Sequence, residues 1–197
     1  MYKKQMTFQR IVCFALLIGA ALVFVYSLGL MTDLYDALYT TIRSANNLDR
    51  TTVTGSRLYY DMQGFNKTFT GVSIAMILVT LTLFITNTHS RRRYYIGNFI
   101  TTGLVSILNV GASVWAISQI MTYKAQFLQI DFEALKKHAE SRNTLYTEST
   151  FWFDASFVVF GILIVLTVLL VANLILKLTL MKAEKSLIGT ARKDVRA

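Results

Sequence analysis

Arg91-Arg92-Arg93-Tyr94-Tyr95 is a short basic connection between two apolar runs, each long enough to cross a membrane. Counted outward from this connection, the chain falls into two halves of similar length. Each half contains an apolar run, a long polar segment and a second apolar run. A helix of about 20 apolar residues crosses the hydrocarbon layer of a bilayer, which is about 30 Å thick. The sequence therefore predicts an all-α, polytopic membrane protein with four transmembrane helices.

We expect a single membrane domain that covers the whole chain, residues 1–197. Its transmembrane helices are predicted at residues 11–31, 71–86, 99–120 and 156–176. Helical extensions outside the membrane are predicted at residues 32–70 and 121–155, and a basic cytoplasmic tail at residues 177–197. The predicted architecture is two long helical hairpins whose outer ends project from the membrane.

The composition of the chain also favours membrane insertion. Of its 197 residues, 54% are hydrophobic and 16% are charged, and its mean hydropathy of +0.47 is high for a soluble domain. The two chain ends and the central connection carry twelve Lys and Arg against two acidic residues, whereas the two outer segments carry eight against nine. Because positive residues gather on the cytoplasmic side, both termini and Arg91, Arg92 and Arg93 are predicted to be cytoplasmic.

This charge distribution also bears on the partners of the protein. Basic residues beside a membrane contact anionic lipid headgroups, so residues 91–93 are assigned to topology and headgroup contact and not to nucleic acid. The proline-free, cysteine-poor and basic chain favours a bacterial plasma membrane. The expected partners are the lipid bilayer and other membrane-protein subunits, in a hetero-complex or a homo-oligomer.

Cysteine usage excludes several familiar classes of four-span protein. Cys13 is the single cysteine and lies inside the first apolar run, so no intramolecular disulfide can form. Connexin-like, claudin-like and tetraspanin-like proteins share the four-span layout but depend on cysteines in their outer loops. The chain fits none of these families.

The first outer segment continues the helical pattern of the first span. Leu34 and Leu38 keep an apolar face beyond the predicted membrane boundary, and a partner could contact this face. The Thr-rich stretch 48–56 is predicted to be a loop. Helix is predicted to resume near Arg57 and to run into the second span.

The second outer segment continues the third span in the same way. Leu128, Phe132 and Leu135 recur every three or four residues, and Ala139 extends the series. This spacing predicts that the helical period continues outward, with an apolar face that is also a candidate partner surface. A turn is predicted near residues 141–150.

The tripeptide Asn66-Lys67-Thr68 matches the sequon for N-glycosylation. Three-residue patterns are common by chance, and this one lies only a few residues from the second span. We therefore give it little weight.

Three pairs of small residues at i, i+4 spacing mark places where helices can approach closely. They are Ala15 with Gly19, Gly71 with Ala75, and Ala112 with Ala116. Small side chains allow dispersion contacts between helix backbones in lipid, where no hydrophobic driving force exists. Such pairs suit packing within the chain and packing against a partner equally well.

Asn109 is the polar residue nearest the middle of the third predicted span, and the four spans contain no charged residue and no histidine. Proton relays and ion-coupling sites generally place ionisable groups at membrane depth, so their absence argues against such chemistry. Asn109 is expected to make a hydrogen bond between helices. The alternative is that it lines a polar pathway.

Motifs for catalysis or cofactor binding are lacking. The sequence contains no glycine-rich phosphate loop, no Gly-x-Ser-x-Gly and no Cys/His spacing typical of zinc. His89 and His138 are predicted to lie on opposite sides of the membrane. We therefore expect no enzymatic activity, no cofactor and no metal.

The function favoured by these features is a non-catalytic accessory or assembly subunit of a larger membrane complex, as in a transport system. One alternative is a small homo-oligomeric channel or carrier with Asn109 on its path. Another is a surface sensor whose outer helices bind a ligand and whose tail signals to a partner. The tail keeps apolar residues at helical intervals, which fits either a continuation of the fourth helix or an amphipathic segment on anionic lipid.

Overall fold

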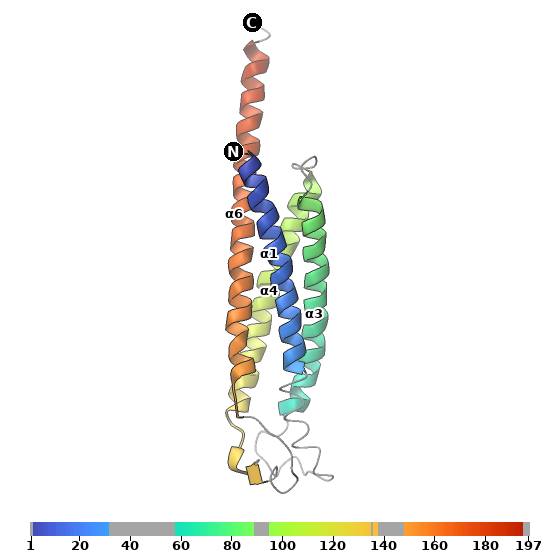
Figure 1. Cartoon of the computed structure of the whole chain (residues 1–197), viewed down its shortest axis with the longest axis vertical. Coiled ribbons are helices and arrows are strands. Elements are labelled where there is room, and N and C mark those ends of the chain that lie inside the picture. The colour runs from blue at the N-terminus through green and yellow to red at the C-terminus, as the bar shows by residue number, and fades with distance from the viewer. Residues whose placement is uncertain (1, 32–57, 89–94, 135, 138–147, 195–197) are drawn as a thin grey trace. The chain divides into compact units, whose positions relative to one another are not determined.

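The computed structural model describes residues 2–31, 58–88, 95–134, 136–137 and 148–194. Four long helices dominate these residues (Figure 1): α1 Tyr2–Gly29, α3 Leu58–Asn87, α4 Ile96–Phe127 and α6 Phe151–Asp194. Each of the four is long and apolar enough to cross a membrane. The described part of the chain is therefore all-helical, with four candidate membrane spans, as the sequence predicts.

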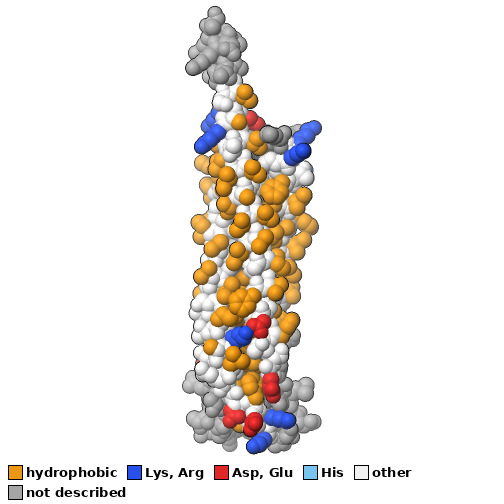
Figure 2. Space-filling view, turned by 90° about the vertical axis from the view of Figure 1, so that its left-hand side faces the viewer, with side chains coloured by type: hydrophobic (Ala, Val, Ile, Leu, Met, Phe, Trp, Pro, Cys, Tyr) orange, Lys and Arg blue, Asp and Glu red, His pale blue; other side chains and the backbone are white. Residues whose placement is uncertain are grey.

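The helices are apolar on their outer as well as their inner faces. In α1, Leu16 and Val23 are fully buried, whereas Phe14 and Val25 are 55% and 62% exposed. Figure 2 shows hydrophobic side chains spread over the described helical surface on one face of the molecule. A surface helix of a soluble protein normally carries polar residues on its outer face, whereas a helix that is apolar all round is buried in protein or lipid. The helices thus have the composition of membrane spans.

The described residues pack as two compact units. Unit 1 comprises the described parts of Met1–Ala20, Met76–Val110 and Leu163–Ala197. Unit 2 comprises those of Ala21–Ala75 and Gly111–Ile162. All four helices contribute residues to each unit.

Helix α3 begins at Leu58, next to the predicted restart near Arg57, and continues to Asn87 without a break. Tertiary packing fixes its orientation: Met62, Phe65, Phe69 and other residues of one face are buried. A spacing of three or four residues places these side chains on the same side of a helix. The restart was predictable because the Thr-rich stretch before it lacks any apolar period.

Helix α4 is shorter than expected. It ends at Phe127, and a turn follows at residues 128–130 before helical structure returns at residue 132. A turn therefore interrupts the predicted outward continuation of the helix between Phe127 and Phe132. The side-chain carboxylate of Asp131 accepts a hydrogen bond of 3.0 Å from the backbone N–H of Ala134, so Asp131 caps a new helical start.

Helix α6 is the longest helix, with 44 residues. It continues through most of the predicted tail to Asp194, so residues 177–194 extend the fourth helix and do not form a separate segment. Within the described residues, this helix contains no proline that would interrupt its backbone hydrogen bonds.

Candidate functional site

Buried side-chain amides join three helices of unit 1. Gln5 of α1 donates hydrogen bonds of 2.9 Å to the side-chain oxygens of Gln9 and of Asn173 in α6. Gln9 donates to the backbone carbonyl of Asn87 at the end of α3. All four side chains are at least nine-tenths buried. We call Gln5, Gln9, Asn87 and Asn173 the amide cluster.

The amide cluster also reaches α4. The side-chain nitrogen of Asn87 donates hydrogen bonds to the hydroxyl of Thr101 at 3.1 Å and to that of Thr86 at 3.2 Å. Thr101 belongs to α4, so all four helices of unit 1 share one hydrogen-bonded group. In surroundings of low dielectric constant such bonds are electrostatically strong, and a member left without partners is costly. The amide cluster therefore specifies how these helix segments pair.

Asn109 makes a second polar contact in unit 1. Its side-chain nitrogen donates a hydrogen bond of 3.2 Å to the hydroxyl of Thr167 in α6. That hydroxyl donates in turn to the backbone carbonyl of Leu163 at 2.8 Å. Asn109 and Thr167 are both buried. This geometry supplies the interhelical hydrogen bond that we expected of Asn109.

Lys177 is a buried cation that the sequence analysis missed. Its side chain is only 4% exposed, and its ammonium lies 4.9 Å from the centroid of the Phe99 ring. A lysine placed in this way is attracted by the negative face of the ring. Among the described residues, no carboxylate lies within ion-pair distance of the Lys177 ammonium. Lys124, by contrast, forms an ion pair with Asp154.

A signal for this placement was present in the sequence. Lys177 follows Asn173 by four residues and Leu170 by seven, so it falls on their face once the fourth helix is extended. The sequence pattern instead predicts that Lys177 begins a cytoplasmic tail, because it is the first charge after an apolar run. Both Leu170 and Asn173 are buried, and Lys177 is buried with them.

An aromatic cluster fills the interior of unit 2. Phe65 and Phe69 of α3 stack with their centroids 5.5 Å apart, and Trp115 of α4 lies 5.4 Å from Phe65. Tyr26 of α1 meets Phe69 and Phe160 edge-on, at 6.1 and 6.2 Å. Offset and edge-on pairs of this kind contribute about 0.5–1.5 kcal/mol each beyond the area they bury. Rings from α1, α4 and α6 thus all contact the α3 pair.

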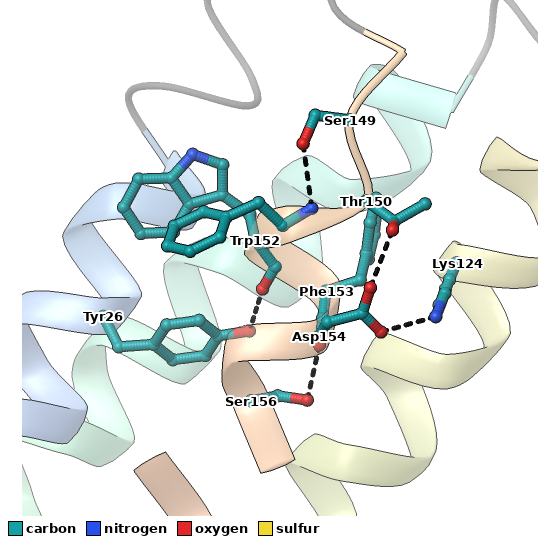
Figure 3. Close-up of polar contacts among 9 residues, drawn as sticks. Tyr26, Lys124, Ser149, Thr150, Trp152, Phe153, Asp154 and Ser156 are labelled. Carbon is teal, nitrogen blue, oxygen red and sulfur yellow. Dashed lines mark hydrogen bonds and ion pairs between the residues drawn. The ribbon is translucent and has the colours of Figure 1, made fainter. Parts of the chain in front are cut away.

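The start of α6 is fixed by polar contacts (Figure 3). The hydroxyl of Ser149 accepts a hydrogen bond of 3.2 Å from the backbone N–H of Phe151, which satisfies one of the first free donors of the helix. The hydroxyl of Thr150 donates to the Asp154 carboxylate at 2.7 Å. The same carboxylate forms an ion pair of 2.5 Å with Lys124 of α4. A negative charge in the first turn also suits the helix dipole.

Tyr26 connects this first turn to α1 (Figure 3). Its hydroxyl donates a hydrogen bond of 2.7 Å to the backbone carbonyl of Trp152. The Trp152 ring lies so close to Gly29 that a Cβ atom at position 29 would overlap it. Any larger residue at this end of α1 would therefore require the indole ring to shift.

Asn66 lies on the inner face of α3 with its side chain 2% exposed. Within the described residues neither of its amide atoms has a hydrogen-bond partner, and the hydroxyl of Thr70, one turn later, has none either. Buried amides are rarely left unpaired. An asparagine buried in a folded helix is also inaccessible for glycosylation, which agrees with the little weight given to the sequon at residues 66–68.

The three pairs of small residues have different surroundings. Ala112 and Ala116 are both buried. Gly19 is also buried, and a Cβ there would lie 3.2 Å from a methyl of Leu166, so it faces the interior. Its partner Ala15 is half-buried. Gly71 and Ala75 instead lie on the exposed face of α3. A Cβ at Gly71 would meet nothing within 4 Å. One of the three pairs is therefore open to contact from outside the chain.

Other residues predicted from the sequence are only partly placed. Leu128 is 61% exposed in the turn after α4, and the Phe132 ring lies 5.3 Å from that of Phe127. The remaining predicted residues lie outside the described part of the chain: Leu34, Leu38, Arg91, Arg92, Arg93 and Leu135.

The described polar groups are mainly amides and hydroxyls that bond one helix to another. In the described ranges, no three His, Cys, Asp or Glu side chains gather where they would hold a metal ion. Comparisons of the chain with protein-family models, with curated proteins and with solved structures find no match.

Proposed function

We propose that this protein is a non-catalytic accessory or assembly subunit of a larger membrane complex, such as a transport system. It would lie in a bacterial plasma membrane with both termini in the cytoplasm and with its helices in two hairpins. The observation that carries this proposal is the exposed small-residue pair Gly71 and Ala75 on α3.

The contrast between the three small-residue pairs supports a partner helix. Ala112 and Ala116 are buried inside the chain, whereas the position beside Gly71 is empty to 4 Å. In lipid, small residues at this spacing let a second helix backbone approach closely enough for dispersion contacts. The face of α3 around Gly71 and Ala75 is therefore suited to a helix from another subunit.

The membrane location is supported by the outer faces of the helices. Large apolar side chains are exposed along all four, among them Ile107, which is 74% exposed. Exposed apolar surface of this extent is rare on soluble monomers and marks contact with lipid or protein.

The hairpin arrangement is supported by the contacts within unit 1. Gln9, near the start of α1, bonds to Asn87 at the end of α3, and Asn87 bonds to Thr101 near the start of α4. Neighbours that meet start to end run in opposite directions, as consecutive spans of a hairpin do. The amide and hydroxyl groups engaged in these contacts hold helices together, which fits a structural role.

The proposal is tested by recovery of partners from the native membrane. The tagged protein is solubilised in mild detergent, and mass spectrometry identifies the proteins recovered with it in stoichiometric amount. In the variant Gly71→Ile we expect the partner to be lost while the thermal stability of the isolated chain is unchanged, because the new side chain has free space.

Gly111→Ile is the matched control, because Gly111 of α4 is equally open but has Ile107 and Trp115 at the i−4 and i+4 positions in place of a small residue. It should retain the partner. The proposal would be overturned if the protein is recovered only as a homo-oligomer and this oligomer transports a solute after reconstitution. That result would favour the channel or carrier.

A further inference from the structure

A groove runs between α1 and α6 in unit 1. Its walls come from Lys4, Gln5 and Phe8 of α1 and from Leu176 and Leu180 of α6. Its volume is about 320 Å³. This volume is at the lower end of the range for sites that hold a small ligand.

The lining of the groove matches an acyl chain. Phe8, Leu176 and Leu180 present carbon atoms to its interior, and a ligand there would meet almost no polar surface. Within a membrane the abundant apolar ligands are lipid acyl chains. They gain dispersion contacts on entering a concave wall that they do not gain from other fluid chains.

Charge at the groove identifies the headgroup. Lys4 lines the groove. Further along α6, Lys182 and Lys185 follow with Glu184 between them, so the charge of this stretch is positive. A lysine near an anionic membrane surface is worth about 1 kcal/mol of attraction, and its long stem lets the ammonium reach the headgroup level.

The amide cluster holds this groove in shape. Gln5 lines the groove and also donates hydrogen bonds to Gln9 and Asn173. The bond to Asn173 connects the α1 wall of the groove directly to α6. A site held by hydrogen bonds before the ligand arrives loses little conformational entropy on binding.

We propose that the groove binds one anionic phospholipid. One of its acyl chains lies against Phe8, Leu176 and Leu180, and its phosphate contacts the ammonium of Lys4. Because Gln5 belongs to both the groove and the amide cluster, the bound lipid also stabilises the packing of α1 on α6.

The test uses native mass spectrometry of the full chain in detergent, titrated with phosphatidylglycerol or with phosphatidylcholine of the same acyl chains. The wild-type protein should retain one phosphatidylglycerol with preference over phosphatidylcholine. In Lys4→Gln this preference should fall about fivefold, which is the loss of about 1 kcal/mol. Lys3→Gln is the matched control, because Lys3 lies next in sequence but does not line the groove, and it should keep the preference.

A second variant tests the apolar part of the site. Leu180→Trp fills the groove and should abolish retention of both lipids. Circular dichroism without added lipid checks that each variant keeps the helical content and unfolding midpoint of the wild type. Equal losses in Lys3→Gln and Lys4→Gln, or lipid retention by Leu180→Trp, would overturn the proposal. If the wild-type protein forms a dimer and Leu180→Trp is monomeric, the occupant of the groove is a second copy of the chain.

Discussion

The side-chain nitrogen of Asn109 in α4 donates a hydrogen bond of 3.2 Å to the hydroxyl of Thr167 in α6. Both side chains are buried in unit 1, and the Thr167 hydroxyl is itself bonded to a backbone carbonyl of α6. The bond connects the two polar groups to each other and so gives Asn109 a role in helix pairing.

We expect Asn109→Leu to lower stability by about 0.6 kcal/mol, the mean worth of a hydrogen bond between membrane helices. Thr167→Val should cost a similar amount, and the double variant should cost little more than either single one. Unfolding in mixed micelles measures all three. If the protein conducts ions in reconstituted vesicles and Asn109→Leu changes that conductance, Asn109 instead lines a polar pathway through the membrane.

The burial of Lys177 leads to a second prediction. Its ammonium contacts the Phe99 ring and, among the described residues, no carboxylate, so it is held away from water with little compensation. We expect Lys177→Met, which keeps an unbranched side chain of similar length, to raise the unfolding temperature. For a protein of this size each kcal/mol gained corresponds to about 2–4 °C.

A variant of Phe99 serves as the control for Lys177. In the wild-type background Phe99→Leu removes the cation–π contact as well as ring packing. In the Lys177→Met background it removes the packing alone and should cost less. A lower unfolding temperature for Lys177→Met itself would show that the ammonium has a stabilising partner.

The end of α1 gives a third prediction. Gly29→Ala should destabilise unit 2, because its Cβ would overlap the Trp152 ring and displace it. Gly64→Ala in α3 should instead stabilise the protein by about 0.5–1 kcal/mol, since alanine favours helix and the site is open. Thermal unfolding of the two variants should therefore give shifts of opposite sign. Equal shifts would show that the ring can move away from Gly29 at no cost.

A fourth prediction concerns the ion pair of Lys124 and Asp154 at the start of α6. Asp154→Asn keeps an acceptor for the Thr150 hydroxyl but loses the charge that faces Lys124. We expect a small fall in unfolding temperature that is larger at low salt than at high salt, because both groups are partly exposed and screened. Lys124→Met should cause a fall of the same kind. The double variant should fall by less than the sum, and strict additivity would mean that the pair has no net coupling.

Much of the fold was predictable from the sequence. Four apolar runs correspond to four long helices, and α3 begins beside the predicted residue Arg57, because helix length and apolar period are local properties of the chain. The break after Phe127 was not predictable from the period, since Leu128 and Phe132 keep helical spacing on both sides of it. The carboxylate of Asp131, which caps the next helical turn, was the missed signal.

The contacts between helices were less accessible to sequence reasoning. Periodicity places Phe69 on an inner face but does not say that Tyr26, from a different helix, meets its ring. Gln5 and Gln9 precede the predicted first span at residues 11–31, yet both are buried in the amide cluster. Lys177 was missed for the same reason, because a predicted membrane boundary was taken as the limit of the packed interior.

Helix α6 is longer than the hydrocarbon layer of a bilayer is thick. Its 44 residues extend about 66 Å at 1.5 Å per residue, roughly twice the thickness of the hydrocarbon layer. If the bilayer extends to Leu180, which lines the groove, the stretch from Met181 to Asp194 reaches about 21 Å further. A partner that binds the last turns of α6 would therefore be held at a fixed distance from the membrane surface.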